Sequence, residues 1–437
     1  MRMFDIIAKK RDKEELTGEE IAFWIQGCLN GQVADYQTTA LLMAIRINGF
    51  SERETIALTE EMRRSGKTLD LSEIDGVKAD KHSSGGVGDK TSLAALPIVA
   101  AAGVKVAKLS GRGLGHTGGT VDKLESIPGF HVNLDSQTFM RQVAETGMAI
   151  SGQSADLDPA DKKLYALRDV TATVDSIPLI AASIMSKKLA TGADVLALDV
   201  KYGSGALLQD IEDSRRLAKL MIRLAKAAGK KASALLTSME QPLGLSIGNA
   251  LEVEEAVQVL QGEGPEDLRQ LSLRLAGEIL WLAGARSDRR QAWALAGDLL
   301  DSGAALEKFK ALILAQGGCV DWQRMAKSPL ILPYPAPAEG YVAAMDTAKI
   351  GYASLLLGAG RAKAEDTVDH AAGIVLCQKR GAYVHAGDTL AYLHCREERQ
   401  AAEAAKLLQE AVTFSQTAPE TGPLIAEIIS TEDDCTD

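Results

Sequence analysis

The fold is decided between residues 195 and 238, where VLALDV (195–200) and SALLTS (233–238) flank EDSRRLAKLMIRLAKAAG (212–229). The two short apolar runs are strand-like, and the segment between them repeats apolar residues at helical spacing. A strand, an amphipathic helix and a second strand are typical of a parallel sheet, because parallel neighbours need a long crossover. Another strand-like run, VKVAKL (104–109), continues the pattern. We therefore predict an α/β fold with a central mixed or parallel sheet.

Helical segments precede and interrupt this pattern. Thr17 and Glu20 form a capping box ahead of an apolar run, and Ser51 and Glu54 form another. Residues 159–192 again have a helical pattern, which we interpret as the chain returning to the helical layer before it re-enters the sheet.

Three domains are expected: a small all-helical domain that faces a larger α/β domain across a cleft, and a C-terminal α+β domain. Prolines in LPYPAPAEG (332–340) indicate a linker ahead of the last of these. The expected domains are 1–70 plus 159–192 (helical), 71–158 plus 193–331 (α/β, phosphate-binding) and 340–437 (α+β).

The composition excludes several classes of protein. Of the 437 residues, 46% are hydrophobic and 24% charged, as in ordinary globular proteins. A net charge of −11 and only 4% aromatic residues argue against a nucleic-acid or membrane-surface partner. No apolar run reaches membrane-spanning length, and the five scattered cysteines lack the spacing of a zinc site or a disulfide framework. We expect a cytoplasmic protein.

Two glycine-rich stretches carry the chemistry. They are KHSSGGVGDKTS (81–92) and KLSGRGLGHTGGTVDKLE (108–125). Clustered glycines let the backbone approach an oxyanion closely, and Ser, Thr and Lys can complete its shell. Two such loops in succession favour one phosphate held from both sides.

Generic nucleotide motifs fit less well. The first loop is not a P-loop, because Asp89 separates Gly88 from Lys90. In the second, Gly113, Gly115 and Gly118 satisfy the dinucleotide pattern GxGxxG, with Asp135 about twenty residues further on. The helix that follows would end at Pro128 after barely two turns, so a nicotinamide enzyme is kept only as a minor alternative.

The chain resembles the thymidine and pyrimidine-nucleoside phosphorylases. The resemblance lies in both glycine-rich stretches, ADKKLYALRDVTATVDSIPLIAASIMSKKLA (160–190), QPLGLSIGNALEVEEA (241–256) and EDTVDHAAGIVL (365–376), and it covers nearly the whole chain. It implies cleavage of a pyrimidine nucleoside by phosphate to the free base and an α-pentose 1-phosphate. It also implies a homodimer, for which the first helices with Trp24 are candidate interface elements, and no organic cofactor.

The resemblance assigns site residues by position. Those matched to phosphate binding are Lys81, Ser83, Ser92, Lys108, Ser110 and Thr120. Those matched to the base are Arg168, Ser183 and Lys187, with Leu114, Tyr165 and Ile180 as candidate pocket walls. His82 is a candidate general acid near the pyrimidine O2, or an orienting hydrogen-bond partner, while Arg168 and Lys187 are expected to stabilise the departing base.

Two positions depart from the family pattern. Ala206–Leu207 stands where relatives often have phenylalanine, which predicts a roomier base pocket. The family's monovalent cation, K⁺, is implied at Gly88, Lys90, Leu243, Ser246 and Glu255. Its ligands are mainly backbone carbonyls, but the ammonium of Lys90 would be unfavourable beside a cation unless it points away.

Lys108 bears on the sugar. The thymidine-restricted members that the chain resembles carry methionine there, whereas lysine can donate to a 2′-hydroxyl or to phosphate. We therefore expect broad use of uridine, 2′-deoxyuridine and thymidine. A thymidine-restricted enzyme, an anthranilate phosphoribosyltransferase-like enzyme and an inactive nucleoside-binding protein are the alternatives.

Overall fold

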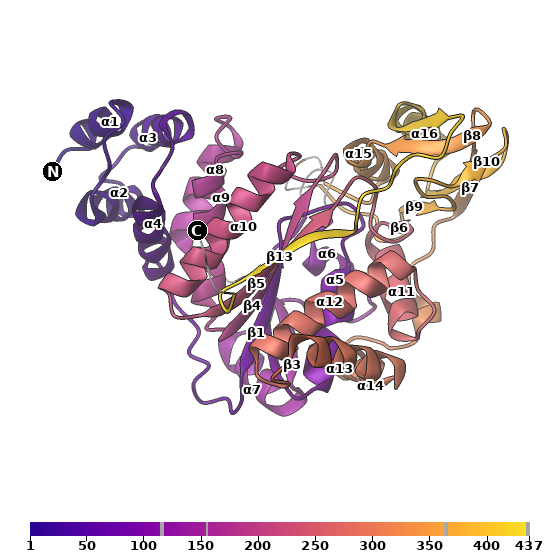
Figure 1. Cartoon of the computed structure of the whole chain (residues 1–437), viewed down its shortest axis with the longest axis horizontal. Coiled ribbons are helices and arrows are strands. Elements are labelled where there is room, and N and C mark those ends of the chain that lie inside the picture. Colours follow the sequence, from indigo (N-terminus) through magenta and orange to yellow (C-terminus); the bar gives the residue numbers. More distant parts are fainter. Residues whose placement is uncertain (114–117, 154–155, 362, 364–365, 434–437) are drawn as a thin grey trace.

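A computed structural model describes residues 1–113, 118–153, 156–361, 363 and 366–433, and Figure 1 shows a helical region, a central sheet with its helices and a C-terminal region. The helical region consists of α1 (Met3–Arg11), α2 (Gly18–Asn30), α3 (Asp35–Asn48), α4 (Glu52–Arg64), α8 (Pro159–Asp169) and α9 (Ile177–Ala190). Both predicted capping boxes are present, at the start of α2 and of α4. The apolar faces of these helices form one core, so the segment 159–192 does rejoin the N-terminal helices.

The central sheet has six strands in the order β13-β5-β4-β1-β2-β3. Their bounds are β1 (Lys78–Ser83), β2 (Lys105–Ser110), β3 (Met148–Gly152), β4 (Val195–Tyr202), β5 (Lys231–Ser238) and β13 (Ile425–Ser430). All neighbours are parallel except β13, which runs antiparallel to β5. The predicted strand–helix–strand unit is confirmed as β4, α10 (Ile211–Ala227) and β5.

Helices cover both faces of this sheet. On one face the core includes residues of α5 (Thr91–Ala101), α11 (Asn249–Leu260), α12 (Glu266–Leu282), α13 (Arg289–Asp301) and α14 (Ala304–Ala315). On the other face α9 and α10 pack against β4 and β5. Helix α9 therefore belongs to two cores, and it joins the helical region to the sheet. Two further helices of the α/β region are α6 (Thr120–Glu125) and α7 (Ser136–Thr146), and α6 is as short as Pro128 predicts.

The C-terminal region contains two small sheets, β10-β8-β12 and β6-β9-β11-β7, packed with two helices. Its elements are β6 (Ser246–Ile247), β7 (Leu330–Pro335), β8 (Gly340–Met345), α15 (Thr347–Leu357), β9 (Gly373–Leu376), β10 (Tyr383–Val384), β11 (Thr389–Cys395), α16 (Glu398–Ala411) and β12 (Val412–Ser415). A short 3₁₀ helix, η1 (Trp322–Arg324), precedes it.

Two sequence-based expectations about this region are wrong. Part of the predicted linker 332–340 is the edge strand β7, which tolerates Pro333 and Pro335 because it pairs only with β11. The last strand, β13, leaves the predicted domain 340–437 and completes the central sheet beside β5. An alternation of apolar residues predicts a strand but not the sheet that the strand joins, because strand pairing depends on residues far away in the sequence.

One further expectation fails in the helical region. Trp24, proposed for a dimer interface, is fully buried in the core of its own domain and is not available to a partner. The exposed large apolar side chains of the first three helices are instead Phe4, Leu29, Tyr36 and Ile47. No helix among the described residues is both long and apolar enough to cross a membrane.

Candidate active site

The site lies where the strand order of the sheet changes direction. From β1 the chain moves outward through β2 to β3, then returns to β4 on the other side of β1. Loops from β1 and β4 consequently separate at their carboxyl ends, which is where open α/β sheets bind ligands. A cavity of about 360 Å³ lies there, and residues of the helical region close its other side.

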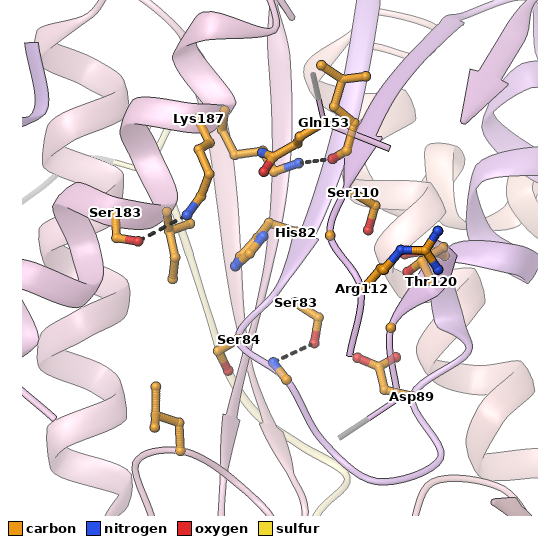
Figure 2. A pocket seen from close by; sticks show the side chains of 18 of the residues that line it. His82, Ser83, Ser84, Asp89, Ser110, Arg112, Thr120, Gln153, Ser183 and Lys187 are labelled. Atoms are coloured by element: carbon orange, nitrogen blue, oxygen red, sulfur yellow. Dashed lines mark hydrogen bonds between the residues drawn. The ribbon is translucent and has the colours of Figure 1, made fainter. Parts of the chain in front are cut away.

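Every described residue predicted to hold phosphate or the base lines this cavity. These residues are Lys81, His82, Ser83, Ser92, Lys108, Ser110, Thr120, Tyr165, Arg168, Ile180, Ser183 and Lys187. Leu114, the remaining predicted wall residue, lies outside the described residues. In Figure 2, Ser183 and Lys187 lie on one side of the cavity, Ser110 and Thr120 lie on the other, and His82 lies between them.

Lys81 is the buried cation of the first loop that lines the cavity. Its side chain is only 1% exposed, and its ammonium donates to Thr91 Oγ1 at 2.6 Å. Asp199 and Asp89 approach the same ammonium at 3.4 and 3.8 Å. Asp199 is also paired with Lys201, at 2.8 Å. Burial opposes ionisation of Asp89, but Lys81, Lys201 and nearby Lys123 outweigh it and hold its pKa well below the usual range.

Lys108 and Lys188 share one carboxylate beneath the second loop. Lys188 contacts Asp80 at 2.7 Å and donates to Leu109 O at 3.0 Å, while Lys108 is 3.7 Å from Asp80 and donates to Lys81 O at 2.6 Å. Burial, and then the charge of Lys188, lowers the pKa of Lys108 to about 7. Four lysines therefore face three aspartates on this side, and one of the lysines is readily neutralised. Such a site gains from binding an anion.

The helical side supplies two cations from α8 and α9. The guanidinium of Arg168 donates to Leu179 O, Val174 O and Thr173 O at 3.0, 2.7 and 3.3 Å, not to Asp161 or Asp169 as an ordinary surface ion pair would. Three of its five N–H groups are thereby used, which leaves two for a ligand. These carbonyls fix the guanidinium, so it is pre-oriented at the cavity wall.

Lys187 is held in a similar way. Its ammonium contacts Asp161 of α8 and donates to Ser183 Oγ, one turn earlier on α9, at 3.0 Å. The i, i+4 spacing places Ser183 and Lys187 on one helix face, as predicted. Figure 2 shows this pair directed toward His82.

His82 is neutral in this surrounding. Burial, followed by the charges of Lys188, Lys108, Lys187 and Lys81, holds its pKa well below the ordinary value. An imidazolium acid is therefore disfavoured, and a neutral imidazole that donates one N–H is favoured. This pKa favours the orienting hydrogen bond over the general-acid role for His82, and both roles stay predictions.

Some lining residues were not predicted. They include Ser84, Asp89, Leu109, Arg112, Gln153, Val174, Ile184 and Lys188. Leu207, the residue for which a roomier base pocket was expected, also lines the cavity. The counter-charges Asp80, Asp161 and Asp199 were missed as well. Their signal in the sequence is weak, since Asp80 and Lys188 are 108 positions apart.

The residues implied to hold a cation also come together, but around a lysine. The ammonium of Lys90 contacts Glu255 and donates to Leu243 O and Ser246 O at 3.0 and 2.8 Å. Gly88 packs against the same loop, where an added Cβ would lie 2.6 Å from Leu243 O. Among the described residues there is no cluster of three or more His, Cys, Asp or Glu side chains that could hold a metal.

Three family models match the chain in succession. Residues 4–66 match the helical bundle domain of a glycosyl transferase family, residues 75–306 match its a/b domain, and residues 341–415 match the pyrimidine nucleoside phosphorylase C-terminal domain. The fold resembles a solved anthranilate phosphoribosyltransferase from Thermus thermophilus, with a TM-score of 0.59 and 20% identity over 71% of this chain and 98% of that one.

Curated relatives match over almost the full length. The chain is 48% identical to the pyrimidine-nucleoside phosphorylase of Geobacillus stearothermophilus over 98% of this chain and 100% of that protein. It is 50% identical to that of Staphylococcus aureus (strain bovine RF122 / ET3-1), over 95% and 96%. The chain therefore belongs to the pyrimidine-nucleoside phosphorylase family.

Proposed function

We propose that the protein cleaves pyrimidine nucleosides with inorganic phosphate, accepting uridine, 2′-deoxyuridine and thymidine. The observation that carries the proposal is one cavity lined by hydroxyls and lysines of the two glycine-rich stretches and by Arg168 of α8 and Ser183 and Lys187 of α9. The names of the relatives support the same reaction class.

The reaction needs positioning and charge stabilisation more than covalent help. A phosphate oxygen attacks C1′ as the bond from C1′ to the base nitrogen breaks, and the electron pair of that bond leaves with the base. The hydroxyl proton of hydrogen phosphate balances the base anion, so the products are a pentose 1-phosphate and the neutral base. Lys81, Ser83, Ser92, Lys108, Ser110 and Thr120 would orient the phosphate.

Residues of the helical side would stabilise the negative charge on the departing base. Lys187 would stabilise the base anion from its O2 side and Arg168 from its O4 side, with His82 donating a hydrogen bond near O2. Tyr165 and Ile180 would form the pocket walls. The two sides come from different domains, so closure of the cavity would complete the site.

A phosphate-omission assay tests the reaction class. Uridine is incubated with the protein with and without phosphate, and uracil and ribose 1-phosphate are measured by chromatography. We expect both products only with phosphate. Uracil released without phosphate would indicate a hydrolase, and no turnover despite uracil binding would indicate an inactive binding protein.

The sugar preference should depend on Lys108. In Lys108→Met, turnover of uridine should fall more than that of thymidine, because only uridine has the 2′-hydroxyl to which lysine can donate. One hydrogen bond to a charged group is worth enough to change the ratio of the two kcat/KM values by about tenfold. Equal losses for uridine and thymidine would contradict this role.

Anion binding should weaken above neutral pH. An anion favours protonated Lys108, whose pKa is about 7 in the free protein, so affinity is greatest below that pH and falls as the pH rises through it. Above that pH the association constant for the anion should fall by nearly tenfold per pH unit, because binding takes up one proton.

Sulfate is a suitable probe because it stays a dianion between pH 6 and 9, whereas phosphate itself titrates. Its dissociation constant is measured by calorimetry for the wild type and for Lys108→Met. The variant should bind more weakly with little pH dependence, and an unchanged slope would assign the proton to another group.

The remaining expectations about the assembly and location stay predictions. We infer a homodimer from the family relationship and from the exposed side chains Phe4, Tyr36 and Ile47 on the helical region. A cytoplasmic location is inferred from the sequence alone.

A further inference from the structure

The loop of residues 242–246 is bound by two ammonium groups, one fully buried and one half-buried. Lys90, whose side chain is fully buried, donates to Leu243 O and Ser246 O at 3.0 and 2.8 Å and contacts Glu255. Lys379, from the C-terminal region, contacts Pro242 O and donates to Gly244 O at 2.8 Å. Successive carbonyls of this loop thus point at positive charges.

The charges of this cluster balance without any added ion. Glu255 accepts from Leu245 N and Ser246 N with one oxygen, at 2.9 and 3.0 Å, and pairs with Lys90 through the other. Asp267 pairs with Lys379 at 2.9 Å and accepts from Gly244 N at 3.1 Å. Two ammonium groups therefore face two carboxylates, so an additional cation would leave an unpaired positive charge in a buried place.

A monovalent cation consequently does not fit beside Lys90. Carbonyl and carboxylate oxygens are the ligands that K⁺ takes in proteins, and the ammonium of Lys90 binds oxygens of three residues implied to hold it, Leu243, Ser246 and Glu255. Lys90 does not point away from the loop, as would be required for both to bind. The ammonium and K⁺ carry the same charge, and either can satisfy the same oxygens.

We propose that the side chain of Lys90 takes the place of the monovalent cation, so that this protein is stable and active without K⁺. Lys90 immediately precedes α5 and directly follows Gly88 and Asp89 of the first glycine-rich loop. Its ammonium therefore joins the phosphate loop to residues 242–246, and these lead into β6, which pairs with β9 of the C-terminal region. The inference goes beyond the proposed reaction and concerns how the phosphate loop is fixed.

Replacing Lys90 should restore a cation site. In Lys90→Thr the two carbonyls and Glu255 lose their positive partner, and K⁺ can replace it. Melting temperatures are measured in KCl and in tetramethylammonium chloride at equal ionic strength, because the second cation is too large for the loop. We expect no difference for the wild type, and melting several degrees higher in KCl for Lys90→Thr.

Lys10→Thr is the matched control. Lys10 is also a buried lysine paired with a glutamate, and its ammonium binds both oxygens of Glu54 at 2.8 and 2.9 Å. Glu54 lies in the helical region, away from residues 242–246. Lys10→Thr should lower the melting temperature equally in both salts, which separates loss of a buried pair from creation of a cation site.

The melting temperatures test this proposal even if the protein lacks the proposed activity. A wild type that melts several degrees higher in KCl, or that turns over only with K⁺, overturns it. So does a folded Lys90→Thr that is indifferent to K⁺. If Lys90→Thr does not fold in tetramethylammonium chloride, refolding in KCl alone supports the proposal, and failure in both salts contradicts it.

Discussion

Lys187→Met should lower kcat for uridine phosphorolysis by about 10²- to 10³-fold, the loss typical when one group that stabilises transition-state charge is removed. The ammonium lies at the cavity between Asp161 and Ser183, so its position is fixed before the base becomes an anion. Phosphate binding should change little, because the phosphate side draws on other lysines. Steady-state kinetics and phosphate calorimetry measure the two effects separately.

A better leaving group distinguishes this role from a structural one. The base of 5-fluorouridine is the more stable anion and needs less help, so the Lys187→Met penalty should be smaller for it than for uridine. Lys187→Met/Asp161→Asn removes both charges of the pair and serves as the stability control. If the penalty is equal for the two nucleosides, Lys187 does not stabilise the leaving base.

The sequence predicted local features, such as helix starts, better than it predicted which strands pair with one another. Capping boxes at Thr17 and Ser51 depend on neighbours three residues away, and both are confirmed. Strand β13 and edge strand β7 were misplaced, because their partners lie far along the chain. Local patterns specify an element, while long-range packing specifies its sheet.

The same distinction applies to the site. The described residues that the motifs predict to bind ligands all line one cavity, so the motifs were sufficient to identify them. Their counter-charges are not in those motifs: Asp80 reaches Lys188, and Asp199 reaches Lys81, only through the pairing of β1 with β4 and the packing of α9. These aspartates determine which cations are available to a ligand, and no spacing in the sequence reveals them.

Lys81→Met should weaken phosphate binding by about 10²-fold, the value of a strong hydrogen bond to a charged group. The substitution leaves three lysines facing three aspartates instead of four facing three, so the net positive charge that attracts an anion is lost. Asp199 retains Lys201 at 2.8 Å and Thr237 at 2.6 Å, so the carboxylate beneath Lys81 does not lose all its partners. Calorimetric titration with phosphate measures the change.

Uracil binding supplies the decisive comparison between the two substitutions. If phosphate and base occupy opposite sides of the cavity, Lys81→Met weakens phosphate and spares uracil, while Lys187→Met spares phosphate and weakens the transition state for base release. Each variant is then the other's folding control, because a general loss of structure would weaken both ligands in both proteins. If Lys81→Met weakens uracil as much as phosphate, the lysine supports the whole cavity rather than the anion, and the assignment of the first glycine-rich loop to phosphate is wrong.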